Sequence, residues 1–292
     1  MTMVLPPEIT HAAIHADIGT LQTFLDQHPE RVDAVDGSDG PQGNRTMTEL
    51  TLICLSQNPP ARALQVLRLL LSRGADANRR LDPEEEGPTL LQESCLCVWS
   101  EGVAALLQAG AEINLTCSPG GAPPSHTMAI LLCDAWLQND PRGRTAVEVV
   151  HDMRKCVELL LRNGAPLDFL AYNVMRSLES RIQLMFFNSG AGEDVASVND
   201  ALDDVLHLAK AVRAAQSTST SARLTPWQKY CLAPPKELLL LRSLVARGRA
   251  RERQRLRSIF ESETPREFSL LFARSFPNEL FWRVMAFRNP RY

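Results

Sequence analysis

The residues best able to bind a metal ion in this chain are its cysteines and histidines. The seven cysteines are scattered, and Cys95 and Cys97 form the only close pair. A zinc site would need two further ligands at similar spacing, and the six histidines do not supply them. His11 and His15 lie four residues apart without a thiol or carboxylate to complete a site. The sequence therefore predicts no metal centre and free, largely buried thiols.

Two stretches carry residue types that catalyse reactions or bind phosphate in other proteins. The carboxylates of residues 82–86 are adjacent in one loop rather than held across a cleft, which favours a solvated charge run over acid–base catalysis. The glycines of residues 36–47 are followed by no Gly-Lys-Ser or Gly-Lys-Thr sequence, so they do not predict a phosphate cradle. We therefore expect a protein that is not an enzyme and that binds no cofactor.

An arginine-rich stretch, residues 242–257, carries the residue type that binds nucleic acid. Its arginines, Arg247 and Arg251 among them, mostly alternate with other residues, and this spacing spreads them over two sides of a helix. No aromatic residue for base stacking lies between them. The pattern favours a solvated helix or contact with an acidic protein partner, with nucleic acid or a nuclear-import signal as the alternatives.

The composition places few limits on the class of protein. The net charge of the 292 residues is -3, which gives no overall attraction to nucleic acid. No run of 18 apolar residues occurs, and the first residues lack a charged start followed by an apolar run. We therefore expect neither a membrane span nor a secretion signal, and predict a cytoplasmic or nuclear protein.

One short pattern recurs along the chain and predicts its architecture. LLLSRGADAN from Leu69 returns as LLQAGAEIN from Leu106 and as LLLRNGAPLD from Leu159. In each copy leucines of a helix are followed by a glycine, namely Gly74, Gly110 or Gly164, suited to a left-handed helix end. Units of this kind cannot bury their apolar face alone, so they stack on one another.

These tails resemble the end of the second helix of the ankyrin repeat. Thr89-Leu90-Leu91-Gln92 partly matches the first-helix signature T-P-L-H, and Thr48-Glu49-Leu50-Thr51 matches it more poorly. The resemblance covers residues 8–191 and implies an all-α protein, an ankyrin-type solenoid of paired helices. It also implies that the protein binds other proteins as an adaptor or scaffold.

The resemblance divides the chain into units. In the opening unit, residues 8–36, we expect Gly19 to break between two helices, and in the second Asn58-Pro59-Pro60 to separate them. Residues 128–136 and 145–162 are expected to be the helices of the fourth unit. A contracted fifth unit is expected to place two short helices at 167–176 and 178–187. Residues 194–216 then predict one amphipathic helix that caps the stack.

The remaining residues predict a separate helical module. We expect a repeat domain at 1–216, a linker at 217–221 and a helical extension at 222–292. Thr225-Pro226-Trp227-Gln228 has the arrangement of a helix start with a capping box. FPNELFWRVMAFRNP from Phe276 resembles the opening helix of the F-box, and the preceding leucine-rich piece resembles the SOCS box. These resemblances imply an alternative function, substrate recognition for a ubiquitin ligase whose adaptor docks on the C-terminal helices.

The partner of such a stack is expected at its loops and at its concave face. Trp99 predicts either an anchor for a partner or a ring buried against the next unit. The partner is another protein, with no membrane contact expected. The predicted partner-binding residues are Asp36, Arg45, Asn78, Arg79, Arg80, Asp82, Trp99, Asn114, Arg247 and Arg251, with the 118–126 loop beside them.

Overall fold

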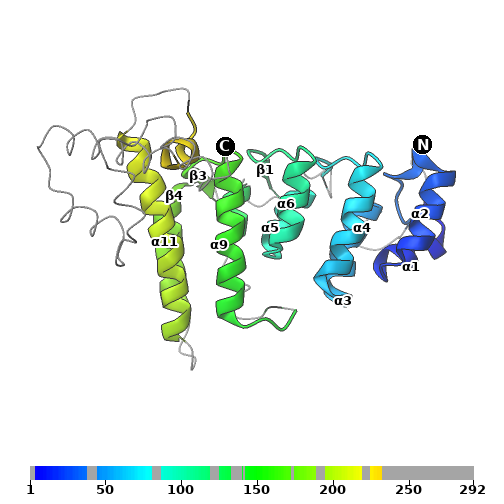
Figure 1. Cartoon of the computed structure of the whole chain (residues 1–292), viewed down its shortest axis with the longest axis horizontal. Coiled ribbons are helices and arrows are strands. Elements are labelled where there is room, and N and C mark those ends of the chain that lie inside the picture. The colour runs from blue at the N-terminus through cyan, green and yellow to red at the C-terminus, as the bar shows by residue number, and fades with distance from the viewer. Residues whose placement is uncertain are drawn as a thin grey trace, which may run out of the picture. The chain divides into compact units, whose positions relative to one another are not determined.

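The computed structural model of the chain is mostly helical, with a few short strands (Figure 1). It describes residues 4–37, 45–80, 87–118, 125–132, 140, 142–171, 174–188, 195–218 and 224–231. The chain divides into two compact units, Met1–Arg213 and Ala214–Tyr292. In the described part of the chain no helix is both long enough and apolar enough to cross a bilayer.

Helices of the first unit follow one another in pairs along the chain. The pairs are α1 (Pro7–Ile14) with α2 (Ile18–Gln27), α3 (Met47–Gln57) with α4 (Pro60–Ser72), α5 (Leu90–Leu96) with α6 (Ser100–Gln108), and α7 (Thr127–Leu131) with α9 (Ala146–Arg162). A short 3-10 helix, η1 (Pro29–Arg31), follows α2, and α10 (Leu178–Asn188) and α11 (Val195–Thr218) come last. The helix expected over 145–162 is thus confirmed as α9, whose first residue follows Thr145.

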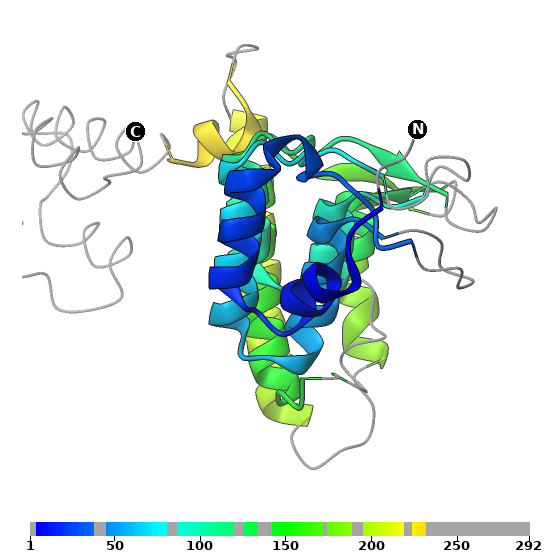
Figure 2. The ribbon, with the colours of Figure 1, turned by 90° about the vertical axis from the view of Figure 1, so that its right-hand side faces the viewer.

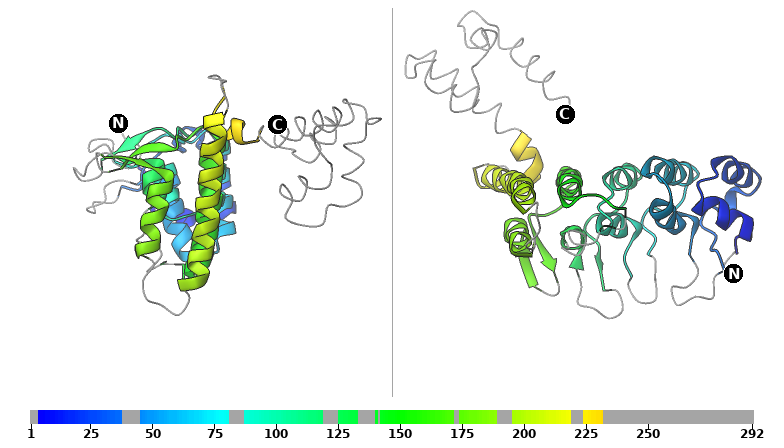
Figure 3. Two further views of the ribbon diagram at one scale, coloured as in Figure 1. Left: turned by 90° about the vertical axis from the view of Figure 1, so that its left-hand side faces the viewer. Right: turned by 90° about the horizontal axis from the view of Figure 1, so that it is seen from below.

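The paired helices form two rows. The first members, α1, α3, α5 and α7, contact one another in chain order and make the inner row. The second members, α2, α4, α6 and α9, do the same and make the outer row. Figure 3 (right) shows both rows, and Figure 2 looks along them from the α1 end. Leucines between the rows are fully buried, among them Leu25, Leu67, Leu106 and Leu160, so each outer helix turns its apolar stripe toward the core.

Short antiparallel pairings join one pair of helices to the next. Isolated bridges close Val35 on Thr46 and Arg80 on Thr89. Further along, β1 (Thr116–Cys117) pairs with β2 (Ser125–His126), and β3 (Asp168–Ala171) pairs with β4 (Val174–Ser177). We call these closures fingers 1 to 4 in chain order. Each finger ends immediately before a helix, α3, α5, α7 or α10, and the strands lie beside the inner row, on the side away from the outer row (Figure 3, right).

Side-chain caps fix where three of the helices after the fingers begin, namely α3, α5 and α10. Thr46 and Glu49 form a capping box at α3, and Thr89 and Gln92 form the same box at α5. At α10 the Ser177 hydroxyl accepts the Ser180 N–H at 3.1 Å. Helix α3 begins at Met47, directly after its cap residue, because the Thr46 side chain satisfies the free N–H of Glu49.

The recurring glycines occupy the same backbone conformation. Gly74, Gly110 and Gly164 have φ of 90°, 90° and 96°. After each, the alanine N–H returns to the carbonyl of a helix leucine: Ala75 to Leu70 at 3.1 Å, Ala111 to Leu106 at 3.0 Å and Ala165 to Leu160 at 2.9 Å. The outer helices α4, α6 and α9 therefore each end in the same kind of turn, as the repeated pattern predicts.

The break inside the first unit was predicted at Gly19, and this was wrong. Helix α1 ends at Ile14, and Ala16 takes the left-handed conformation with φ of 57°. The Asp17 carboxylate then caps α2 by accepting the Thr20 N–H at 3.2 Å, which places Gly19 inside the first turn of α2. The cap decided the boundary, because Asp17 satisfies a free N–H of the first turn, whereas Gly19 has no side chain to do so.

Residues 167–176 were predicted to be helical, and this too was wrong. Residues 168–171 and 174–177 form the two strands of finger 4, in which Phe169 faces Arg176 and Ala171 faces Val174. Phe169 and Ala171 are buried while Asp168 is exposed, an alternation typical of a strand. A strand pair satisfies these backbone groups while leading directly into α10, which lies at the expected residues 178–187.

The last described elements agree in part with the prediction. The amphipathic helix expected at 194–216 is α11, which also includes Ser217 and Thr218 of the expected linker. The predicted capping box at Thr225 is present, since the Gln228 N–H donates to the Thr225 hydroxyl and the Thr225 N–H donates to the Gln228 side chain. The F-box-like and SOCS-box-like stretches lie outside the described residues.

Candidate partner-binding surface

Finger 1 brings together two of the predicted residues. The Arg45 N–H donates to the Asp36 carboxylate at 2.9 Å, and the Asp36 N–H donates to the Arg45 carbonyl at 2.7 Å. Both residues are half-buried. The carboxylate of Asp36 therefore holds the base of finger 1 closed through the Arg45 backbone.

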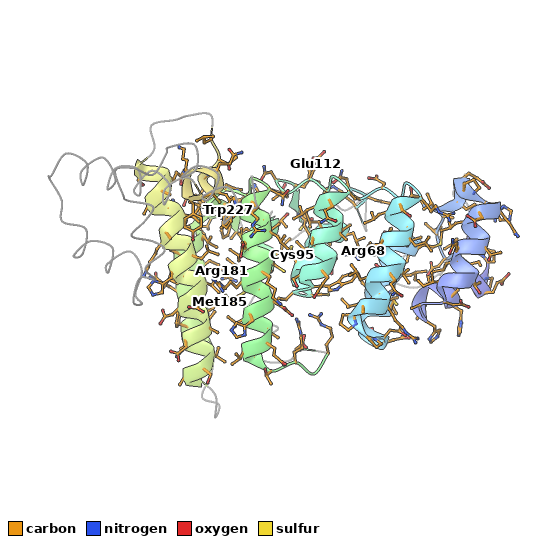
Figure 4. All side chains as sticks on the ribbon, viewed as in Figure 1. Arg68, Cys95, Glu112, Arg181, Met185 and Trp227 are labelled. Carbon is orange, nitrogen blue, oxygen red and sulfur yellow. The ribbon has the colours of Figure 1, made fainter. Side chains whose placement is uncertain are left out.

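Finger 2 carries three more predicted residues, and each makes bonds to another segment. The Asn78 side chain accepts the Glu112 N–H at 2.7 Å, which ties the corner after α4 to the corner after α6. Glu112 is labelled in Figure 4. Arg80 donates to the carbonyls of Gly87 and Thr116 at 2.9 and 3.0 Å. Arg79 donates backward to the Asp33 carbonyl at 3.2 Å. These side chains therefore set the spacing between successive fingers.

The Asn78 contact has an equivalent one unit earlier. There Asp33 accepts the Asp76 N–H at 3.3 Å, and Asp76 stands two residues after Gly74 just as Glu112 stands two after Gly110. In the next unit the corresponding residue is Pro166, which has no N–H to donate. Asn114, which would accept it, is exposed. Asn114 is thus the predicted residue of this set whose side chain is presented most openly.

Removing the Asn78 side chain is expected to loosen the joint between finger 2 and the next corner. Asn78→Ala should lower the free energy of unfolding by about 1 kcal/mol, the usual value of one lost hydrogen bond. Asn78→Asp should lose less, because a carboxylate still accepts the Glu112 N–H, as Asp33 does at the equivalent place. Chemical denaturation of the full chain measures both values, and equal losses for the two variants would contradict this role.

Trp99 is fully buried, at 0% exposure, so it lies outside the partner-binding surface. It is the N-cap residue of α6, and its ring lies against Gly102 of the same helix. Val98 before it takes the left-handed conformation with φ of 49°, unusual for a β-branched residue. The ring therefore belongs to the core.

A charged cluster that the sequence did not predict covers this turn. The guanidinium groups of Arg142 and Arg144 donate to the carbonyls of Cys97 and Val98, at the end of α5. Arg144 also makes two bonds to Asp140, at 3.1 and 2.9 Å, and one to Asp152 at 3.0 Å. The Asp140 side chain is only 2% exposed, so its charge is held by these arginines rather than by water.

Cys95, Cys97 and Cys156 lie in surroundings that disfavour reactivity. Burial raises the pKa of Cys97 to about 11 and raises those of Cys95 and Cys156 well above the ordinary range. These thiols therefore stay protonated near neutral pH. Among the described residues, no group of three or more His, Cys, Asp or Glu side chains is arranged to hold a metal ion.

Finger 4 exposes apolar side chains that the predicted set did not include. On β4, Val174 is 47% exposed and Met175 is 63% exposed. They were missed from the sequence, because this segment was assigned to a helix and the alternating exposure of a strand was therefore not expected. Three members of the predicted set, Asp82, Arg247 and Arg251, lie outside the described residues, as does most of the 118–126 loop.

Comparison with known proteins assigns no family to this arrangement. No family model matches the chain, and no curated protein sequence matches it.

Proposed function

We propose that the protein is a non-catalytic adaptor, an ankyrin-type solenoid that binds a protein partner through its fingers and inner row. The observation that supports this proposal is the repeated order of finger, capped inner helix, outer helix and left-handed turn. Thr46 and Thr89 begin inner helices in the same way, and Gly74, Gly110 and Gly164 end outer helices in the same way. A unit built repeatedly on one plan presents a continuous rigid surface, which loses little entropy on binding.

The polar network between the fingers supports the same function. Asn78 and Arg80 fix one finger against the next through hydrogen bonds, so the finger ends are held in register before any partner arrives. Asn114 and Met175 are then presented on this preformed edge. Preorganised surfaces of this kind gain affinity because little ordering remains to be done on binding.

The test compares surface variants of the full chain used as bait. Asn114→Arg and Met175→Lys change exposed finger residues, and Arg68→Glu changes an exposed residue of α4 in the outer row (Figure 4). We expect a protein captured by the wild type to be lost from both finger variants and kept by Arg68→Glu. Capture that survives both finger changes but fails with the outer-row change would contradict the proposed surface.

A further inference from the structure

The side of α5 that faces away from the core carries one carboxylate among apolar side chains. Glu93, Leu96 and Cys97 are spaced three and four residues apart, so they share one side of the helix, and all three are half-buried. The residues on the opposite side, Leu91 and Cys95, are fully buried. Glu93 therefore lies on the part of α5 that faces outward from the core.

Half-buried apolar residues stand on the two helices that flank α5 in the inner row. Helix α3 contributes Ile53, which follows its cap Thr46 by seven residues, as Leu96 follows Thr89. Helix α7 contributes Ile130, which follows the cap residue of α7 by the same four residues that separate Glu93 from Thr89. Both helices contact α5. The middle of the inner row is thus an apolar strip with Glu93 within it.

The Glu93 carboxylate is half-buried and makes no hydrogen bond or ion pair within the described residues, whereas three other carboxylates of this region are paired. Glu49 accepts the Thr46 N–H at 2.8 Å, Asp36 accepts the Arg45 N–H, and Glu179 accepts two bonds from Arg213. Burial alone raises the pKa of Glu93 above its ordinary value, and the groups coupled to it are the thiols of Cys97 and Cys117. No cation offsets its charge in the described surroundings, and a desolvated charge gains most from pairing.

We propose that Glu93 receives an arginine side chain of a protein partner, flanked by apolar side chains that cover Leu96 and Ile130. The inference rests on the proposed function and names the chemistry of the partner at that same surface. Arginine fits better than lysine, because its planar group can donate two bonds to one carboxylate and loses less hydration on burial. One central ion pair ringed by apolar contact is a common plan for a binding hot spot.

The test selects short linear peptides displayed on phage against the full chain. We expect the selected peptides to carry arginine beside apolar residues. A synthetic peptide of this kind should bind Glu93→Gln roughly tenfold or more weakly than wild type, the usual size of a lost charge-assisted hydrogen bond. Glu101→Gln, the same change at an exposed position of α6, should leave its affinity unchanged. Citrulline in place of the peptide arginine should weaken binding to wild type but make little further difference to Glu93→Gln.

Several outcomes separate the inference from the function on which it rests. The melting temperature of Glu93→Gln should not fall, since the change removes an unpaired charge on a half-buried side chain. Weaker binding could then not be attributed to unfolding. Selected peptides that lack a cation, or that bind Glu93→Gln as well as wild type, overturn the inference. If the affinity of these peptides still falls with Asn114→Arg or Met175→Lys, the proposed function stands without the inference. Peptides whose affinity is changed neither by Glu93→Gln nor by Asn114→Arg or Met175→Lys, or a library that yields no binder, count against both the inference and the proposed function.

Discussion

Gly102→Ala is expected to destabilise the protein strongly, although alanine is the better helix former. A Cβ at this position would lie 2.5 Å from Cδ2 and 2.7 Å from Cζ3 of the Trp99 indole. The ring is fully buried, so it cannot move aside without disturbing its neighbours in the core. Overpacking of this kind costs about 2 kcal/mol, more than the gain of up to about 1 kcal/mol in helix propensity. Thermal or chemical unfolding of the full chain measures the difference.

Gly19→Ala is the matched control for this substitution. Gly19 also lies in the first turn of an outer helix, α2, but a Cβ there would meet only the Asp17 carboxylate at 3.7 Å, an ordinary contact. This variant should be stabilised by about 0.5–1 kcal/mol, because alanine loses less backbone entropy than glycine on folding. The explanation fails if the two variants shift the stability in the same direction.

Arg144→Ala is expected to cost about 3 kcal/mol, the size of effect seen when a buried ion pair loses one partner. The variant leaves Asp140, at 2% exposure, without its two-bond partner, and it removes donors from the Cys97 and Val98 carbonyls. Lys155→Ala is the control, because Lys155 also pairs with Asp152 but its side chain is 63% exposed. That surface pair should contribute less than about 0.5 kcal/mol. Similar losses for both variants would contradict a special role for Arg144.

The stability lost in Arg144→Ala should also depend on pH. Burial favours the neutral form of Asp140, but hydrogen bonds and charge from Arg144 outweigh it and hold the pKa below the ordinary 3.8. In the wild type this stabilisation is therefore present above pH 3.8 and lost as the pH falls through the folded pKa. Without Arg144, burial raises the pKa of Asp140, so the penalty is present at neutral pH and relieved in acid. Denaturation across this range should show the gap between the two proteins narrowing toward low pH.

The helices were predictable where one residue type decided the local structure. Gly74, Gly110 and Gly164 end helices because glycine takes the left-handed conformation at little cost, and Thr89 and Thr145 begin them because their hydroxyls accept a free N–H. These are interactions between residues close together in the chain. They are therefore readable from the sequence.

The turns inside the helix pairs were less predictable. Ala16 and Val98 both take the left-handed conformation without the glycine that marks it elsewhere. Val98 is held there by bonds from Arg142 and Arg144, which lie more than forty residues away in the chain. No local pattern contains that information, so neither the turn at Val98 nor the arginine cluster was foreseen. The turn at Ala16 was misplaced at Gly19 for a local reason, because Asp17 caps α2 and sets its first residue.

By itself, the sequence determined that the chain builds similar helix pairs, because leucine spacing, caps and glycines act over one or two turns. Tertiary structure alone decided which polar residues join the units and which face outward. Asn78 binds the next corner, Trp99 enters the core and Met175 stays exposed on a strand. The physical reason is that burial and long-range hydrogen bonds depend on what the neighbouring unit places opposite each residue, and that neighbour is set by packing rather than by adjacent sequence.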